Sequence, residues 1–151
     1  MTDKPIENAL ITNLGSGLIL PRPVGSQYLI TARFGQLTDR HGKKLWGEIG
    51  HTGTDFATPI GTQAECVYDG EVIYSQYHEV IGLAVWIVSE YRGVKFAHNY
   101  AHGSNLLCKD GDRIRAGQPV LLTGNSGKST GPHLHFKICL WPSRIAIDPK
   151  Y

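Results

Sequence analysis

The hydrophobic positions of the chain fall in short runs separated by turn-forming residues. The 151 residues include 18 glycines and 8 prolines, and no stretch keeps the i, i+3, i+4, i+7 apolar spacing of a long helix. The runs are rich in Val, Ile, Tyr, Phe and Trp, which favour strands. The pattern therefore predicts an all-β fold, a small domain of antiparallel β-sheet. Its predicted strands are Tyr28–Phe34, Ala64–Tyr77, Leu83–His102, Pro119–Thr123 and His133–Trp141.

Turn signals divide two of these runs and mark the ends of the domain. Asp69-Gly70 in ECVYDGEVIY and Tyr91–Gly93 in WIVSEYRGVKF each predict a β-hairpin. The polar, glycine-punctuated segment Gln36–Gly50 predicts a surface loop. A chain of this length holds one core, so we expect a lead-in segment over residues 1–22, ending at LPRP, and a single domain over residues 23–151.

Composition excludes several classes of protein. With 41% apolar and 19% charged residues, and no apolar run near the roughly 20 residues of a membrane span, the chain is expected to fold without inserting into a membrane. The net charge of +2 is small and scattered, which argues against a nucleic-acid partner. The three cysteines form no CxxC pair and are expected to be buried thiols. The N-terminus does not read as a secretory signal.

The hexapeptide GPHLHF contains two histidines two residues apart. On a β-strand alternate side chains leave the same face, so His133 and His135 would point the same way. This geometry suits a metal site or acid–base chemistry. Spacing alone leaves open whether both histidines bind a metal or one stays free as an acid or base.

Two further segments supply candidate ligands and proton carriers. HTGTDF contains His51 and Asp55, and two imidazoles with one carboxylate are the ligands of a catalytic zinc site that keeps its fourth position for water. FAHNYAHGS places His98, Tyr100 and His102 on one strand face by parity, with one of them expected to be a bystander.

Two look-alike motifs are excluded. SGKST resembles the end of a phosphate-binding loop, but the glycine that this loop needs is replaced by Leu122, and Pro132 and a strand follow where a helix should begin. The helical HExxH zinc motif is absent, since His78-Glu79 has no second histidine.

Three motifs together resemble a known family. HTGTDFATPIGT, NYAHGSNLLCKDGDRIRAGQPV and GNSGKSTGPHLHFKI, in this order, are similar to the lysostaphin-type (LytM-like) zinc metallopeptidases, which cut peptidoglycan. The resemblance covers about residue 22 to the C-terminus. It implies a small antiparallel β-fold, the duplicated hybrid motif, with an open substrate groove that holds the metal.

The resemblance also implies a role for each histidine of the motifs. His51, Asp55 and His135 would hold one Zn²⁺ per chain, and His102 and His133 would form the catalytic pair. His98 matches no functional position of the family and becomes the bystander.

The function implied by the resemblance is a zinc metalloendopeptidase that hydrolyses peptide bonds in peptidoglycan cross-links or stems, at the bacterial cell wall or in the periplasm. The alternative is a catalytically silent binding, regulatory or structural module in a phage tail or secretion machine. We expect a phage-encoded protein, carried on the virion or released through a holin. Residues 1–22 would then dock on a phage tail or another assembly partner, or cover the groove.

The walls of the groove have two candidate segments. Gln36–Gly50 and Gly124–Gly131 would line it, unless both are only connections. Trp46, Trp86 and Trp141 are candidates for substrate contact, although core packing is the preferred interpretation for Trp86 and Trp141.

Overall fold

The computed structural model describes residues 20–39, 41–44 and 50–148. These residues form ten β-strands and no helix, which confirms the all-β prediction. The strands are β1 (Ile30–Ala32), β2 (Thr54–Phe56), β3 (Gln63–Glu65), β4 (Gly70–His78), β5 (Gly82–Tyr91), β6 (Val94–Leu106), β7 (Arg113–Ile114), β8 (Pro119–Thr123), β9 (Leu134–Leu140) and β10 (Ala146–Ile147).

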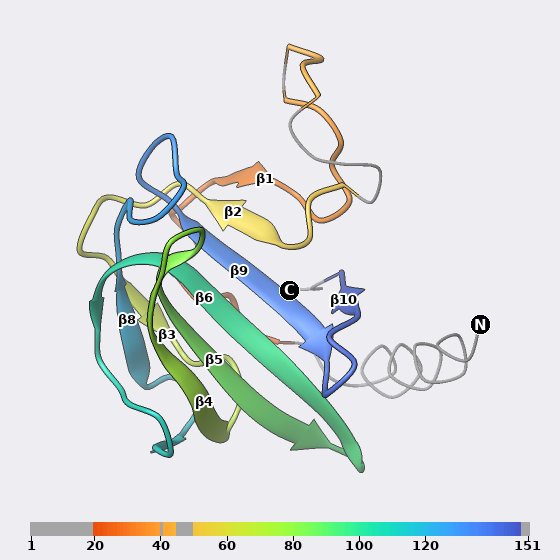
Figure 1. The fold of residues 1–151 in the computed structure, drawn as a ribbon, viewed down its shortest axis with the longest axis vertical. Coiled ribbons are helices and arrows are strands. Elements are labelled where there is room, and N and C mark those ends of the chain that lie inside the picture. Colours follow the sequence, from red (N-terminus) through yellow and green to blue (C-terminus); the bar gives the residue numbers. More distant parts are fainter. Residues whose placement is uncertain (1–19, 40, 45–49, 149–151) are drawn as a thin grey trace.

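The strands pair antiparallel into one sheet. Its order is β1-β2-β9-β6-β5-β4-β7, while β10 pairs with β9, and β8 pairs with both β3 and β6. Figure 1 shows β9, β6, β5 and β4 side by side as a twisted sheet, with β3 and β8 behind it. One broad face of the sheet therefore packs against the β3–β8 pair, and the other face is turned toward the viewer.

The core lies between the sheet and the β3–β8 pair. Its largest buried side chains come from β2, β5, β6 and β9 on one side and from β8 on the other: Phe56, Ile87, Phe96, Tyr100, Leu121, Leu134 and Phe136. On β6 the residues Phe96, His98 and Tyr100 alternate along the core face. Burial of these apolar side chains stabilises the fold, at roughly 25 cal/mol per Å².

The central strand β6 changes partner along its length. Residues 96–101 pair with β9, whereas residues 103–106 pair with β8. His102 lies at the change, with a φ of 62° in the left-handed region. The strand is therefore irregular at one of the predicted catalytic residues.

One of the two predicted hairpins is confirmed. β5 and β6 pair from Tyr91 opposite Val94, and Arg92 and Gly93 between them have φ angles of 49° and 80°. Positive φ at both loop residues is typical of the tight hairpin turn whose twist matches that of the strands.

The hairpin predicted at Asp69-Gly70 is wrong. β3 pairs with β8, and β4 pairs with β5 and β7, so the run Ala64–Tyr77 belongs to two strands that do not pair with each other. Between them the Cys66 amide donates to the Gln118 carbonyl and the Val67 amide to the Tyr100 hydroxyl. Distant parts of the chain thus satisfy the backbone groups that a hairpin would have paired.

The predicted boundary between residues 22 and 23 passes through a packed segment. Leu20 and Val24, on either side of it, are both buried in the core. The rest of the predicted lead-in, residues 1–19, lies outside the described residues, and the division remains a prediction.

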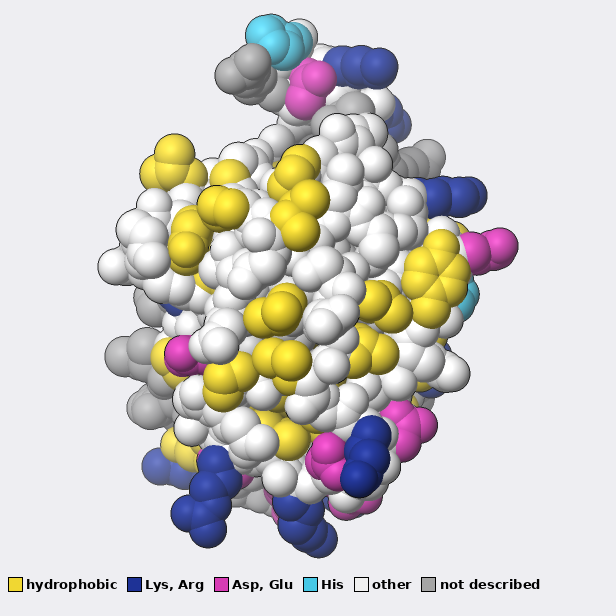
Figure 2. Space-filling view, turned by 90° about the vertical axis from the view of Figure 1, so that its left-hand side faces the viewer, with side chains coloured by type: hydrophobic (Ala, Val, Ile, Leu, Met, Phe, Trp, Pro, Cys, Tyr) yellow, Lys and Arg dark blue, Asp and Glu magenta, His cyan; other side chains and the backbone are white. Residues whose placement is uncertain are grey.

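The surface beside the β3–β8 pair is partly apolar. Figure 2, which turns the left-hand side of Figure 1 to the viewer, shows hydrophobic side chains over the middle of this face and most charged side chains around its margin. Exposed apolar side chains are common on protein surfaces, and we assign no function to them. Within the part of the chain that the structure describes, no helix has the length and hydrophobicity needed to span a membrane.

Candidate metal centre

Two neighbouring strands bring Asp55 and His135 together. β2 pairs antiparallel with β9, and Asp55 lies directly opposite His135 in the register. Side chains opposite each other on antiparallel strands leave the same face, with Cβ atoms about 4.5 to 5.5 Å apart. The carboxylate of HTGTDF and the second histidine of HLH therefore meet on the sheet face turned away from the core.

His51 reaches the same place from the segment that precedes β2. Between His51 and Asp55 the backbone passes so close to β9 that a Cβ at Gly53 would lie 2.4 Å from the Phe136 carbonyl oxygen and 3.0 Å from the His135 ring. Only glycine permits this approach without a shift of β9. The glycine of HTGTDF thus serves to bring His51 against its partners.

Three possible ligand atoms converge at this point. His135 Nδ1 lies 2.8 Å from Asp55 Oδ1, His51 Nε2 lies 3.3 Å from the same oxygen, and the two nitrogens are 3.1 Å apart. Zinc bonds of about 2.0 to 2.1 Å in a tetrahedron separate neighbouring ligands by roughly 3.3 Å. The donor set therefore fits a zinc ion with three protein ligands and one further position.

The electrostatics of the cluster favour an ionised carboxylate. Burial alone would raise the pKa of Asp55, but hydrogen bonds with His135 and His51, and the charges of these rings, outweigh it and hold the pKa well below its usual value. His51 Nδ1 lies 3.2 Å from the Arg33 carbonyl oxygen, to which it donates, so Nε2 is left for a metal. An ionised carboxylate is the form in which an acidic side chain binds a metal ion.

His102 joins this face of the sheet because of the irregularity in β6. Its ring centroid lies 4.8 Å from that of His133 and 6.3 Å from that of His135. The register between β5 and β6 shifts opposite His102, between Leu83 and Val85, and such a bulge reverses the alternation of side chains. The prediction that His102 shares a strand face with His98 and Tyr100 is therefore wrong.

Backbone carbonyls hold the rings of His102 and His133. His102 Nδ1 lies 2.7 Å from the Ser126 carbonyl oxygen, and His133 Nδ1 lies 2.8 Å from that of Gly131. Each ring donates from Nδ1, so its Nε2 remains available as an acceptor. Burial lowers the pKa of His102 despite the opposing hydrogen bond to Ser126, so its ring is neutral at neutral pH. His133 Nε2 lies 3.9 Å from Asp55 Oδ1, beside the three converging ligand atoms.

His98 lies on the other side of the sheet, in the core. Its Nε2 is 2.9 Å from Ser89 Oγ and its Nδ1 is 3.0 Å from the Tyr100 hydroxyl. The ring is fully buried, and burial lowers its pKa to about 3. His98 is thus a hydrogen-bonded core residue that does not reach the cluster.

The predicted loops and thiols have separate outcomes. Gly124–Gly131 supplies the carbonyls that hold His102 and His133, so this run is more than a connection. In the other predicted wall, the Gln36 carbonyl oxygen accepts a hydrogen bond from the His51 amide, but residues 40 and 45–49, with Trp46, lie outside the described residues.

The prediction of buried thiols is confirmed for two of the three cysteines. Cys66 and Cys139 are buried, and Cys108 is half-buried.

Core packing of the two strand tryptophans is a wrong prediction. Trp86 and Trp141 are both half-buried. Trp86 lies opposite Asn99 of β6, and Asn99 lies opposite Lys137 of β9. Because Lys137 is two residues from His135 on β9, Trp86 is on the sheet face that carries Asp55 and His135. The Arg144 guanidinium lies 5.1 Å from the Trp86 ring centroid and 5.5 Å from that of Trp141. The contact that replaces core packing is therefore a cation held against both rings.

Comparison with known proteins identifies the family. The model of peptidase family M23 matches residues 49–149, a range that contains all five of the predicted site residues. The chain belongs to peptidase family M23. This confirms the resemblance to the lysostaphin-type peptidases that the three sequence motifs indicated.

Curated relatives of this M23 chain include an endopeptidase and an activator. It is 40% identical to peptidoglycan DD-endopeptidase ShyB of Vibrio cholerae serotype O1 over 90 residues, 60% of this chain and 20% of ShyB. It is 33% identical to murein hydrolase activator EnvC of Escherichia coli over 139 residues, 91% of this chain and 31% of EnvC. The chain thus spans about a fifth to a third of the length of these relatives.

Solved M23 structures share the fold. The catalytic domain of lysostaphin from Staphylococcus simulans matches with a TM-score of 0.69 and 28% identity, covering 81% of this chain and 89% of that domain. The catalytic domain of EnpA, a prophage-encoded M23 protein of Enterococcus faecalis whose structure is that of a point mutant, matches with a TM-score of 0.71 and 33% identity, covering 88% and 96%.

Sequence reasoning missed the residues that hold the site in place. Ser126 and Gly131 act through backbone carbonyls, and Gly53 acts by lacking a side chain. Their only signal was position, since Gly53 separates His51 from Asp55 and the other two lie in the glycine-rich run before HLH.

Proposed function

We propose that this M23 chain is a zinc-dependent endopeptidase that hydrolyses peptide bonds in peptidoglycan. His51, Asp55 and His135 would hold the ion, and His102 and His133 would carry protons. The observation that carries the proposal is the convergence of His51 Nε2, Asp55 Oδ1 and His135 Nδ1 within 2.8 to 3.3 Å of one another.

The chemistry divides between the ion and the two unligated histidines. Bound zinc would lower the pKa of a water toward about 7 and polarise the scissile carbonyl. The neutral ring of His102 offers Nε2 to accept a proton from the attacking water, because its Nδ1 is engaged with Ser126. His102 would return this proton from Nε2 to the leaving amine, and His133, beside it, would stabilise charge on the carbonyl oxygen when its Nε2 carries a proton.

The peptidoglycan substrate is inferred from the relatives. ShyB is named a peptidoglycan DD-endopeptidase and shares 40% identity with this chain over 90 residues. The test is to incubate the zinc-loaded protein with purified cell walls and to map new amino groups on the released muropeptides. New amines at defined peptide bonds would support the proposal, and cleavage confined to glycan bonds, or no new amine, would contradict it.

A second candidate function rests on EnvC, an activator by name, whose similarity covers 91% of this chain. A silent module would bind a partner hydrolase and raise its activity. The presence of all five site residues supports the enzyme instead. The two functions can be distinguished by adding the His102→Ala variant to a second hydrolase acting on cell walls. An activator would still stimulate that hydrolase, whereas an endopeptidase without His102 would add no cleavage of its own.

Delivery by a phage is part of the proposal and is supported by the shared fold with prophage-encoded EnpA. The protein would act at the cell wall after release through a holin or from the virion, with residues 1–22 as the segment that docks on an assembly partner. Deletion of residues 1–19, which keeps the buried Leu20, should leave turnover intact and abolish any such docking. Unchanged turnover together with unchanged assembly would remove both roles proposed for the segment.

A further inference from the structure

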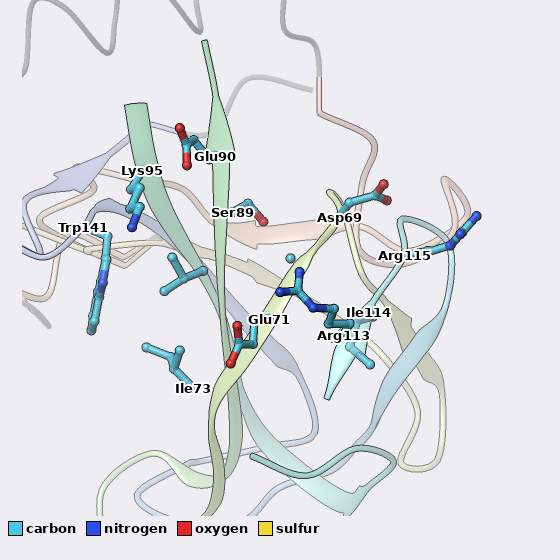
Figure 3. Close-up of a pocket in the computed structure, with 12 residues that line it drawn as sticks. Asp69, Glu71, Ile73, Ser89, Glu90, Lys95, Arg113, Ile114, Arg115 and Trp141 are labelled. Atoms are coloured by element: carbon cyan, nitrogen blue, oxygen red, sulfur yellow. The ribbon is translucent and has the colours of Figure 1, made fainter. Parts of the chain in front are cut away.

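A cavity opens on the sheet away from the metal centre. It has a volume of about 740 Å³ and is lined by residues of β4, β5, β6 and β7 together with Asp69, Arg115 and Trp141. Figure 3 shows Lys95 and Trp141 on one side, Glu71 and Arg113 on the other, and Ile73 below. The side chains of Ile73 and Val88 provide an apolar lining between two charged walls.

Charges of both signs line this cavity. Three cations, Lys95, Arg113 and Arg115, face three acids, Asp69, Glu71 and Glu90. Glu71 lies opposite Arg113 in the register of β4 and β7, and Glu90 lies opposite Lys95 in that of β5 and β6.

The oppositely charged side chains of the cavity nevertheless form no ion pair with each other. Among the described residues, the ion pairs within 4.0 Å all involve Asp55 and a histidine of the metal centre. The cavity is therefore neutral in sum but offers separate cationic and anionic groups to a ligand. A ligand that carries one positive and one negative group would balance charges of both signs, whereas a singly charged ligand would leave those of one sign uncompensated.

The register places this cavity on the same sheet face as the metal centre. Along β9, outward positions run from His135 through Lys137 to Cys139, and the row through Cys139 crosses Ala97 of β6 and Val88 of β5. Cys139 lies about 13 Å along β9 from His135, and Glu71 on β4 lies three strands, about 14 Å, across the sheet from β9. An extended peptide of about six residues, roughly 20 Å long, would therefore reach from the metal centre to the cavity.

The row between them contains an unpaired acceptor. Asn99 lies between Lys137 and Trp86 in the register and is 6% exposed. Its Oδ1 is buried and, among the residues that the structure describes, has no hydrogen-bond partner. Buried polar atoms are normally paired, so an orphaned acceptor on this face indicates a ligand with N–H groups, which a peptide backbone has.

We propose that the cavity binds a zwitterionic residue of the substrate peptide, about six residues from the bond that is cut. The ligand group is an amino-acid centre with a free ammonium and a free carboxylate, such as the second centre of a diamino dicarboxylic acid. Arg113 takes the carboxylate and Glu71, its cross-strand neighbour, takes the ammonium. The assignment of this group as substrate rests on the proposed peptidase function.

The test uses four synthetic peptides that differ only at the residue six positions from the scissile bond. One carries a diaminopimelyl residue with a free second centre; in the others its carboxylate is amidated, its amine acetylated, or both. Masking either charge should raise KM about fivefold and leave kcat unchanged, because an exposed ion pair contributes up to about 1 kcal/mol. Equal KM values for all four peptides would overturn the proposal.

Variants assign each charged group of the ligand to one residue of the cavity. Arg113→Gln should lose the discrimination against the amidated peptide only, and Glu71→Gln the discrimination against the acetylated peptide only. Exposed residues outside the cavity, Lys109 and Glu79, provide the controls Lys109→Gln and Glu79→Gln, which should behave as the original protein. If Arg113→Gln and Glu71→Gln also discriminate normally, the cavity is not the site.

Binding without turnover separates this inference from the proposed function. Calorimetric titration with the free-centre peptide should give a Kd that rises about fivefold in Arg113→Gln and Glu71→Gln. If the protein binds the peptide in this charge-dependent way but cuts no peptide, the binding site is supported and the proposed peptidase function is contradicted. If the protein cuts peptides but its Kd does not depend on the two charges, the peptidase function is supported and the binding site is contradicted.

Discussion

Two histidines of β6, four residues apart, lie on opposite faces of the sheet. His98 is 0% and His102 8% exposed, so burial does not distinguish them. His98 lies in a regular part of the strand and donates and accepts within the core, with Ser89 and Tyr100. His102 lies at a positive φ where the strand changes partner, and it faces His133 on the other side of the sheet. A local irregularity of the backbone therefore decides which imidazole is available for chemistry.

The largest expected effect of breaking this contrast is on turnover. His102→Ala should lower kcat on peptidoglycan peptides about a thousandfold, because proton transfer by a positioned side chain contributes about 10²- to 10⁴-fold. The matched control is His78→Ala, which removes an exposed histidine of β4. A normal rate of amine release by His102→Ala would show that the catalytic assignment is wrong.

The same change at His98 should affect stability instead. His98→Ala leaves a cavity and deprives Ser89 and Tyr100 of a hydrogen-bond partner, at a cost of about 3 kcal/mol in the free energy of unfolding. Urea unfolding measures this loss, and kcat per folded molecule should be unchanged. A variant as stable as the original protein, or one inactive although folded, would contradict the contrast.

Acid sharpens the comparison further. His98 has a folded-state pKa of about 3, whereas in the unfolded chain it titrates near its ordinary 6.5. Between these values the unfolded chain binds the proton and the folded protein does not, so the free energy of unfolding falls as pH drops from about 6.5 to about 3. His98 has no such effect above this window. It should contribute a slope of up to about 1.4 kcal/mol per pH unit.

Comparison of the original protein with His98→Ala separates the contribution of His98 from that of the other titratable groups. The slope of unfolding free energy against pH, measured between pH 4 and 6 on zinc-free protein, should be shallower in His98→Ala than in the original protein (~1 proton less). Identical slopes would mean that His98 is already protonated in the folded state.

A smaller effect is expected where the backbone closes on the metal centre. Gly53→Ala places a Cβ against the Phe136 carbonyl and the His135 ring, so the affinity for zinc should fall about tenfold in chelator competition. Gly131→Ala is the control, because nothing lies within 4 Å of a Cβ there. Equal zinc affinities in the two variants would show that β9 can shift to accommodate a Cβ at Gly53 without weakening zinc binding.

The sequence predicted the parts of this protein that depend on local pattern. Pro119–Thr123 coincides with β8, the turn at Tyr91–Gly93 is the hairpin of β5 and β6, and the strand spacing of HLH lets Asp55 and His135 meet across β2 and β9. In each case neighbouring residues carry enough information, because alternation and turn chemistry act over a few residues.

The remainder depends on contacts between distant residues. Asp69-Gly70 looks like a hairpin turn, but pairing of β3 with β8 prevents it. Parity places His102 with His98 until a bulge opposite β5 reverses the alternation. Trp86 has the apolar character of a core residue, yet the register turns it outward toward Arg144. None of these outcomes is encoded within one strand.

The most direct test of the account is the zinc content of three purified proteins, measured by mass spectrometry after dialysis against zinc-containing and then zinc-free buffer. The original chain and His102→Ala should each retain about one zinc per molecule, and His135→Ala should retain less than about a tenth of that, since two remaining ligands hold the ion poorly. Full zinc occupancy in His135→Ala, or none in the original chain, would contradict the claim that His51, Asp55 and His135 share one ion.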